Sequence, residues 1–353
     1  MNESIPSVTF AVPGDLHLTN RRQSNYDAAL QVVRQINQLL RPDFVQFIGD
    51  NVQDAENEQF QLFQELSSQL QSPWFALIGD HDICGDNSAS RFQQWCGEPF
   101  GSHSLNGFRF LRLNTLDRPR LGLGADQLDW LDNEFHAARI NEERVVVFQH
   151  HYPYKVCESF TGPGINRWRE IMTDYRPVAI VCGHTHYFQV ANNGLFPSIA
   201  VRSIGDPEGG PPGCLVVHLR GDDCALTYRT IEDRGPLILI THPRDILLAT
   251  DGRHVAHRNT SIGVRIWSMT RVMRVTGIVD DNLRIELVAT GDDFWSAPLA
   301  AADLTKGEHV MRIDVELIDG SRGQQTLTFY VDHTRRFTAV PEARPVVRTT
   351  AFC

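Results

Sequence analysis

The sequence lacks the features of a membrane-spanning or exported chain. A spanning helix needs about 20 consecutive apolar residues, and runs such as Val178–Cys182 and Leu237–Ile240 are far shorter. Met1–Ser7 has neither a basic start nor an apolar stretch, so it does not resemble a secretory signal. The seven cysteines form no Cys-x-x-Cys pair. Reduced thiols fit this pattern best, so we predict a cytoplasmic protein that does not act at a membrane.

Positive charge is also scarce. The 353 residues include 33 Lys and Arg against 43 Asp and Glu, a formal net charge of −10. The whole deficit lies in residues 1–232, which hold 18 basic and 28 acidic residues, whereas residues 233–353 hold 15 of each. This balance is poorly suited to binding a nucleic acid polymer or an anionic lipid surface, so we expect neither partner. The acidic part has either a solvated surface or carboxylates gathered to hold cations.

The first part of the chain alternates strand-like and helix-like segments, which predicts an α/β fold. Apolar β-branched and aromatic runs indicate strands, and apolar residues spaced three or four apart indicate helices between them. The predicted strands include 8–12, 44–48, 74–78, 108–113, 145–149 and 178–182, and the predicted helices are 26–40, 60–70, 125–139 and 168–175.

After about residue 236 the pattern changes to alternating apolar and polar residues. Residues 311–317 and 327–331 alternate in this way, and Asp319-Gly320 between them predicts a hairpin. Short strands over about 100 residues are typical of an all-β sandwich with immunoglobulin-like architecture. We therefore predict three parts: an α/β domain over 1–232, a smaller β-sandwich over 233–340, and an extended tail over 341–353.

Polar clusters follow five of the predicted strands. In layered α/β folds, ligands bind at the carboxyl ends of strands, so these clusters are expected to meet at one centre. Burying so many Asp and His side chains without cations costs several kcal/mol for each unpaired charge. The clusters are Asp15-Leu16-His17, Gly49-Asp50-Asn51, Gly79-Asp80-His81-Asp82, His150-His151-Tyr152-Pro153 and Gly183-His184-Thr185-His186.

This ordered set resembles the calcineurin-like metallophosphoesterase superfamily, whose pattern is DxH, GD, GNH(D/E), a later His and GHxH. The resemblance covers about residues 8–232 and implies a four-layer α/β/β/α sandwich with two metal ions. It implies that Asp15, His17 and His186 hold the first metal, that Asp50 bridges both, and that Asp80, His151 and His184 hold the second. It also places His81 beside the leaving group, with Asp82 as the residue that orients it.

The donor set also indicates which chemistry to expect. Nitrogen and oxygen ligands without thiolate suit Mn²⁺, Fe²⁺ or Zn²⁺. Two such ions polarise a phosphoryl group and lower the pKa of a bridging water, so that a hydroxide is available to attack phosphorus. A histidine beside the metals can protonate the leaving alkoxide.

Four places in the motifs depart from the family pattern or leave alternatives open. Position 80 is Asp, where the family usually has Asn, which either tightens metal binding and weakens the Lewis acid or changes little. His151 is favoured over His150 because His-Tyr-Pro has the family's His-x-Pro spacing, and His150 is then a candidate substrate contact or the alternative ligand. Asn51 either contacts the substrate or supports a turn. Gln53 stands where purple acid phosphatases have a metal-binding Tyr, which disfavours that subgroup.

Together these observations predict a metal-dependent hydrolase of small phosphate esters. Diesters are favoured, because His81 fits a leaving-group acid and the set is similar to the cyclic-nucleotide and glycerophosphodiester branch. Two alternatives remain: a phosphomonoesterase on the same site, and a non-catalytic binding or scaffold protein that retains the fold. The β-sandwich is expected to pack against the first domain or to mediate formation of a homo-oligomer.

Overall fold

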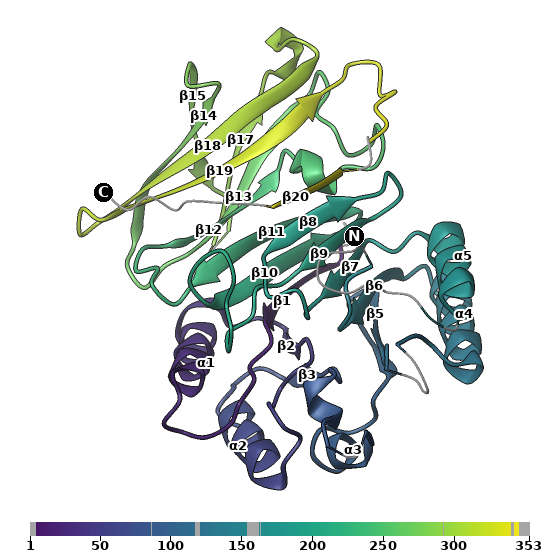
Figure 1. Ribbon diagram of the computed structural model, residues 1–353. Helices are drawn as coiled ribbons and strands as arrows, with labels where there is room; N and C mark the ends of the chain where they lie inside the picture. Colours follow the sequence, from purple (N-terminus) through teal and green to yellow (C-terminus); the bar gives the residue numbers. More distant parts are fainter. Residues whose placement is uncertain are drawn as a thin grey trace.

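The computed structural model describes residues 5–339, apart from 86, 117–120, 154–161, 163 and 292, together with residues 342–345. Two sheets lie face to face in the first part of the chain, and each carries helices on its outer side (Figure 1). The first sheet has the order β11-β10-β1-β2-β3. Its strands are β1 (Ser7–Pro13), β2 (Phe44–Phe47), β3 (Trp74–Ala76), β10 (Gly213–Arg220) and β11 (Asp223–Thr230).

The second sheet has the order β20-β8-β9-β7-β6-β5-β4. Within it the pairs β5–β6, β6–β7 and β7–β9 are parallel. The pairs β4–β5, β8–β9 and β20–β8 are antiparallel. Its strands are β4 (Gly101–Leu105), β5 (Phe108–Leu113), β6 (Arg144–Gln149), β7 (Ala179–Cys182), β8 (Gln189–Asn192), β9 (Pro197–Ala200) and β20 (Glu342–Pro345).

Helices complete the four layers that the family resemblance implies. The first sheet is covered by α1 (Ser24–Gln35), which one π-helical turn extends to Leu40, and by α2 (Asn57–Ser67) and α3 (Ser90–Cys96). The second sheet is covered by α4 (Ala125–Ile140) and α5 (Ile165–Tyr175). Among the described helices, none has the length and apolar character needed to cross a membrane.

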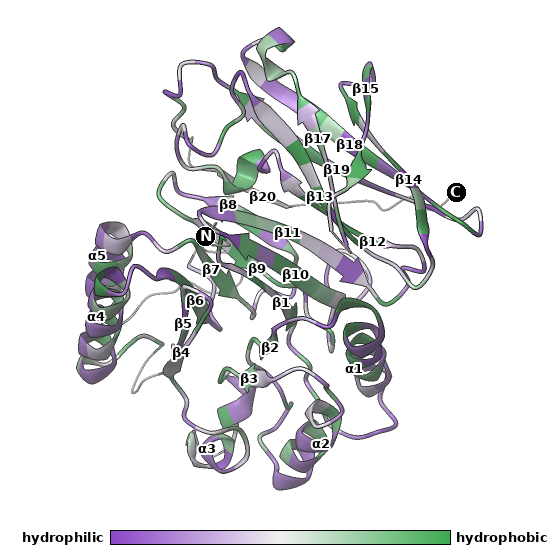
Figure 2. Cartoon of the chain, turned by 180° about the vertical axis from the view of Figure 1, so that it is seen from behind, coloured by the Kyte–Doolittle hydropathy of each residue, from purple (hydrophilic) through white to green (hydrophobic). Residues whose placement is uncertain are grey.

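Aromatic packing between the sheets fixes their spacing. Phe10 stacks on Phe44 of the same sheet at 5.1 Å and meets Phe110 and Phe148 of the other sheet edge-on at 5.7 and 5.6 Å. Figure 2 shows hydrophobic residues along these inner strands and hydrophilic residues on the outward side of α4 and α5. Because protein interiors are close-packed, this core holds the strand ends in fixed relative positions.

The second part of the chain forms a sandwich of two antiparallel sheets around its own core. The sheet orders are β12-β13-β17-β16 and β15-β14-β18-β19. The predicted hairpin at Asp319-Gly320 joins β18 to β19. The immunoglobulin-like topology of this sandwich stays a prediction. Its strands are β12 (Leu237–His242), β13 (Thr260–Trp267), β14 (Val272–Val279), β15 (Leu283–Glu286), β16 (Val288–Ala289), β17 (Phe294–Leu299), β18 (Gly307–Leu317) and β19 (Arg322–Val331).

The chain returns to the first part after the sandwich. Strand β20 pairs antiparallel with β8, with Glu342 opposite Asn192, so this piece of the predicted extended tail belongs to the second α/β sheet. Residues 341 and 346–353 of that tail lie outside the described residues. Near the predicted boundary at 232/233, β11 ends at Thr230 and β12 begins at Leu237.

A buried polar cluster joins the two parts. Thr9 and His218 are opposite each other on β1 and β10, and the Thr9 hydroxyl lies 2.9 Å from His218 Nδ1. Arg265 of β13 donates from Nη1 to Thr9 Oγ1 at 2.6 Å and to His218 Nδ1 at 3.1 Å, and its Nε donates to Asp293 at 3.1 Å. Burial, followed by the charge of Arg265, lowers the pKa of His218 from 6.5 to about 3.

This cluster predicts a specific loss of stability in mild acid. Between pH 6.5 and pH 3 the unfolded chain binds a proton at His218 that the folded chain excludes, so the free energy of unfolding falls as the pH falls through this window. We expect the contribution of His218 to fall by about 2 kcal/mol between pH 6.5 and pH 5. A His218→Asn variant keeps an acceptor for Arg265 but does not titrate. Urea unfolding at pH 6.5 and at pH 5 should therefore show a smaller fall in the free energy of unfolding for the variant than for the parent. An equal fall in both proteins would contradict the prediction.

Candidate metal centre

The predicted site residues come together where β1, β2, β3, β6 and β7 end. Asp15 follows β1, Asp50 follows β2 and Asp80 follows β3, while His150 and His184 follow β6 and β7. Parallel pairing of β1 with β2, β2 with β3, and β6 with β7 directs these ends to the same edges of the two sheets. The convergence that the strand-end pattern predicts is therefore present.

Glycines in the motifs allow the backbone to approach the carboxylates. A Cβ at Gly79 would lie 2.2 Å from Asp50 Oδ1, and one at Gly183 would lie 2.3 Å from Asp15 Oδ1. Both distances are too short for any side chain, so only glycine fits before Asp80 and His184. The backbone of the site is also strained, since His17, Asp50, His184 and His186 all have positive φ values between 47° and 66°.

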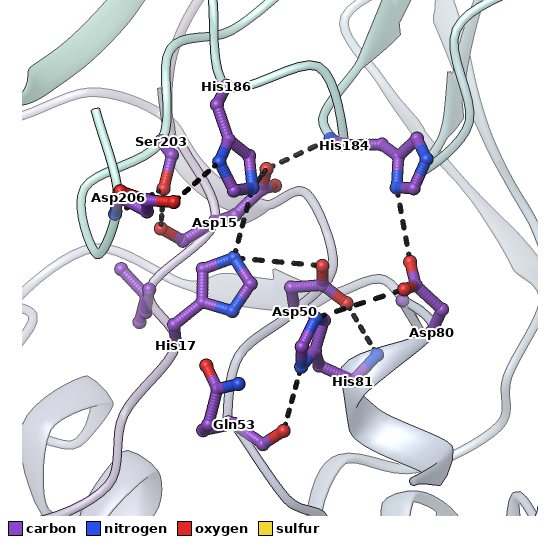
Figure 3. A network of polar contacts seen from close by, with 12 residues as sticks. Asp15, His17, Asp50, Gln53, Asp80, His81, His184, His186, Ser203 and Asp206 are labelled. Atoms are coloured by element: carbon purple, nitrogen blue, oxygen red, sulfur yellow. Dashed lines mark hydrogen bonds and ion pairs between the residues drawn. The ribbon is translucent and has the colours of Figure 1, made fainter. Parts of the chain in front are cut away.

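One group of ligand atoms comes from Asp15, His17 and His186. The two imidazoles face each other, with 3.2 Å between His17 Nε2 and His186 Nε2 (Figure 3). His186 Nε2 lies 3.8 Å from Asp15 Oδ2, and His17 Nε2 lies 3.8 Å from Asp50 Oδ2. This geometry brings together the three residues predicted for the first metal, with Asp50 beside them.

A second group comes from Asp50, Asp80, His150 and His184. His150 Nε2 lies 3.2 Å from Asp50 Oδ2 and 3.0 Å from Asp80 Oδ1, and His184 Nδ1 lies 3.2 Å from Asp80 Oδ1. Asp50 therefore lies between the two groups, which is the position that a bridging carboxylate requires.

The histidine of the second group is His150, whereas the sequence prediction favoured His151. His151 Nε2 is farther from the cluster, 3.8 Å from Asp80 Oδ1, and its Nδ1 lies 2.7 Å from the Thr115 hydroxyl. The His150 ring is fully buried, and its Nδ1 donates to the Ile48 carbonyl at 2.9 Å, which leaves Nε2 directed at the carboxylates. The geometry therefore favours His150 as the ligand and not as a substrate contact.

His81 lies beside both groups, but Asp82 does not orient it. The His81 ring is 4.6 Å from the His17 ring, and its Nδ1 lies 2.8 Å from the Gln53 carbonyl. A carbonyl can only accept, so Nδ1 carries the proton, and Nε2, 4.0 Å from Asp80 Oδ2, is the ring nitrogen that faces the ligand groups (Figure 3). The backbone of Gln53 thus takes the role that the resemblance implied for Asp82.

Asp82 instead holds the loops that carry the ligands. Its fully buried carboxylate accepts hydrogen bonds from the amides of Gly79, Asn51 and Val52 at 2.9 to 3.1 Å, and from the Asn51 side chain at 2.9 Å. Burial, followed by the charge of Asp50, raises the pKa of Asp82 to about 7. Asn51 is also fully buried and donates to the Leu77 carbonyl, which favours its structural role over substrate contact.

Removing the Asp82 carboxylate is expected to destabilise the protein. Asp82→Ala leaves four buried donors without an acceptor, which we expect to lower the free energy of unfolding by about 3 kcal/mol or more. Chemical unfolding measures this loss, and Asp129→Ala, at a largely exposed position on α4, is a control with little effect expected. A stability equal to that of the parent would contradict the assigned role.

Two residues near the site carry no motif and were not predicted. Asp206 places Oδ2 3.4 Å from His186 Nδ1, the ring nitrogen opposite the one that faces His17 (Figure 3). The Ser203 hydroxyl donates to the Asp15 carbonyl at 3.0 Å and accepts from the Asp206 amide at 2.9 Å. A carboxylate behind a ligating histidine fixes the ring and raises its basicity, so Asp206 is placed to orient His186.

The charges and donors of the site fit divalent cations. Asp15 and Asp50 are almost completely buried, and Oδ1 of Asp15 has no hydrogen-bond donor. Burial raises the pKa of Asp15 well above its usual value, and burial lowers the pKa of His17 to about 4. The pKa of His186 is also lowered, chiefly by burial. Neutral imidazoles and converging carboxylates are the ligands that Mn²⁺, Fe²⁺ and Zn²⁺ bind.

Comparisons with known proteins agree with this geometry. Residues 8–188 match the family model described as calcineurin-like phosphoesterase. The chain is 27% identical over 214 residues to a protein of Arcobacter nitrofigilis named probable glycerophosphodiester phosphodiesterase GpdQ, which covers 55% of this chain and 76% of the relative. It is 28% identical over 278 residues to human tartrate-resistant acid phosphatase type 5, with 65% and 83% covered.

A solved structure shows the same fold. A dimetal phosphatase from Danio rerio aligns with 65% of this chain and 98% of its own, with a TM-score of 0.52 and 13% sequence identity. At this identity the likeness concerns the fold alone.

Proposed function

The chain belongs to the calcineurin-like phosphoesterase family, and from this premise we propose that its dimetal phosphoesterase centre acts on phosphodiesters in preference to phosphomonoesters. The observation that carries the proposal is the position of Asp50 between the two ligand groups, with His81 beside them. The name of the Arcobacter nitrofigilis relative supports a diester substrate, and the name of the human relative, an acid phosphatase, supports the rival reaction.

We assign the ligands from the geometry. Asp15, His17 and His186 would hold one ion, Asp80, His150 and His184 would hold the other, and Asp50 would contact both. When bound, two divalent ions supply Lewis-acid polarisation of the phosphoryl group and a water that ionises near neutral pH. Asp80 adds a carboxylate where the family usually has an amide, so the protein itself contributes more negative charge around the second ion.

His81 is the residue placed to protonate the leaving alkoxide of a diester. The alkoxide that leaves a dialkyl phosphate is a strong base and needs a proton in the transition state. The Gln53 carbonyl accepts from His81 Nδ1 and so orients Nε2 toward the ligand groups, where the ring, when protonated on both nitrogens, can deliver a proton from Nε2 and keep the one on Nδ1. The backbone amide of His81 donates to Asp50 Oδ1 at 2.9 Å, which ties the position of the ring to the bridging carboxylate.

A substrate panel tests the proposal. The protein loaded with Mn²⁺, Fe²⁺ or Zn²⁺ is assayed on a cyclic nucleotide, a glycerophosphodiester, bis(p-nitrophenyl) phosphate and p-nitrophenyl phosphate. We expect kcat/KM to be higher for the diesters than for the monoester. Faster cleavage of the monoester would replace the proposal with a phosphomonoesterase, and a centre that binds no metal or is inert would favour a binding protein that retains the fold.

The role of His81 is tested by comparing leaving groups. We expect His81→Ala to lower kcat/KM about 100-fold on a glycerophosphodiester and only a few-fold on bis(p-nitrophenyl) phosphate, whose leaving group needs no proton. His136→Ala, at an exposed position on α4, is the control. Equal losses on both substrates would remove His81 from the acid role.

The setting of the reaction is also part of the proposal. We propose a cytoplasmic enzyme acting on a small phosphate ester, with the β-sandwich available for contacts between copies. Cys84, Cys96, Cys182, Cys214 and Cys224 are free in the described part of the chain, which supports a reducing compartment.

A further inference from the structure

A cavity of about 330 Å³ lies at the far end of β6 and β7 from the metal centre. Arg144, which begins β6, and Val178, which precedes β7, line it, whereas His150 and His184 follow the opposite ends of these strands. His150 comes six residues after Arg144, which corresponds to roughly 20 Å at the usual rise of a strand. The cavity is therefore a place distinct from the ligand groups.

Both parts of the chain form its wall. The first part contributes the last turns of α4 and α5, which lie side by side on the second sheet (Figure 1), and the turn between β8 and β9. The second part contributes the segment that follows β12. The charged lining residues are Arg139, Arg144, Arg176, Arg244 and Arg253 together with Glu143, Asp222 and Asp251.

Each carboxylate of the lining is already held by an arginine. Glu143 accepts from Arg109 at 2.7 Å. Asp222 accepts from Arg144 Nε at 2.6 Å. Asp251 accepts from the Arg253 guanidinium at 2.8 Å. These pairs neutralise the negative charge of the wall.

Positive charge is left over at this wall. Among the residues that the structure describes, neither Arg139 nor Arg176 has a carboxylate within ion-pair distance. The Arg139 guanidinium lies 4.5 Å from the centre of the Tyr175 ring, which holds it beside α5. Arg244, only 8% exposed, is fixed by Asp223 at 3.3 Å. In a chain of net charge −10, unpaired arginines at the rim of a cavity indicate an anionic ligand.

We propose that this cavity binds a small organic phosphate monoester. Its tetrahedral dianion would lie between Arg139 and Arg176, since guanidinium groups match phosphate oxygens with paired N–H donors. Its organic part would contact the apolar lining, which includes Leu195 and Leu248. Because Leu248 and Arg244 belong to the second part of the chain, the ligand would contact both parts at once.

Calorimetric titration of the metal-loaded protein with phenylphosphonate tests the proposal. This probe carries a dianion on an apolar ring, and a phosphoesterase does not cleave its carbon–phosphorus bond. We expect two sites per chain, of which one competes with a phosphodiester substrate and the other does not. Inorganic phosphate, which lacks the apolar part, is expected to bind the second site at least about tenfold more weakly.

Variants separate the two sites. Arg139→Ala/Arg176→Ala should weaken the non-competing site at least about tenfold and leave the competitive inhibition constant unchanged. Arg167→Ala, at a position on α5 that pairs with Asp129 outside the cavity, should leave both sites intact. If the double variant misfolds, Arg176→Gln alone, at an exposed position, is expected to weaken the same site.

Two results would overturn the inference. One is a single phenylphosphonate site per chain, which would assign all binding to the metal centre. The other is a double variant that melts at a lower temperature but binds as many equivalents as the parent, because both arginines lie at helix C-termini, where a cation also stabilises the helix.

Discussion

Asp50→Ala is expected to lower kcat/KM on a phosphodiester by about three orders of magnitude or more and to lower the bound metal from two equivalents toward one. Asp50 is a member of the second group and also borders the first, because its Oδ2 lies 3.2 Å from His150 Nε2 and 3.8 Å from His17 Nε2. Despite its burial, His150 holds the pKa of Asp50 below its usual value, so the carboxylate is charged and available to cations. Its loss therefore affects both metal positions at once.

Metal analysis and steady-state kinetics on the same sample measure this effect. Asp129→Ala removes a carboxylate from the surface of α4 and should keep both equivalents and full activity. Asp50→Asn keeps the shape of the side chain and the acceptor for the His81 amide, so it separates the loss of the charge and of the second ligand oxygen from the loss of side-chain volume. An Asp50→Ala variant that retains most of its activity and two metal equivalents would show that the site lies elsewhere.

The general position of this site follows from local sequence. A strand ends where its apolar run meets Gly-Asp or Gly-His, and the parallel order of the strands then brings those ends together. The close approach of Gly79 to Asp50 and of Gly183 to Asp15 shows why the motifs couple a glycine to each ligand. Such features depend on neighbouring residues, so they are visible in one sequence.

The roles that sequence did not reveal depend on distant contacts. Asp82 accepts from Asn51 and Val52, about 30 positions earlier in the chain, and so acts as a support for the loops and not as the partner of His81. Asp206 reaches His186 because the Ser203 hydroxyl holds its amide, and neither residue belongs to a recognisable pattern. Strand β20 likewise joins β8 across some 150 residues of chain.

The choice between His150 and His151 also depends on contacts between distant parts of the chain. Adjacent residues in extended backbone point to opposite sides, but which side faces the metals depends on the packing of β6 against the first sheet. The ring of His150 packs against Gly49, where a Cβ would lie 2.3 Å from Nδ1, and this contact directs the ring at Asp50. The His-x-Pro spacing carries no information about that contact.

His150→Ala and His151→Ala form a matched pair that tests this assignment. Both rings are buried, and both Nε2 atoms face Asp80, at 3.0 Å for His150 and 3.8 Å for His151. We expect His150→Ala to lose the second metal equivalent and to lower kcat/KM by about 100-fold or more, because it removes a ligand. We expect His151→Ala to keep two equivalents and to lose about tenfold or less, as for a residue that supports a ligand indirectly.

Metal titration followed by activity at each loading distinguishes the two variants. Burial, followed by the charge of His150, lowers the pKa of His151 well below its usual value, so His151 is a neutral ring bound to Thr115 and contributes no charge near the second metal position. Replacing it should therefore change the packing around Asp80 more than the metal affinity. The reverse order of effects, with His151→Ala losing the metal and His150→Ala keeping it, would return the ligand role to the residue that the His-x-Pro spacing favours.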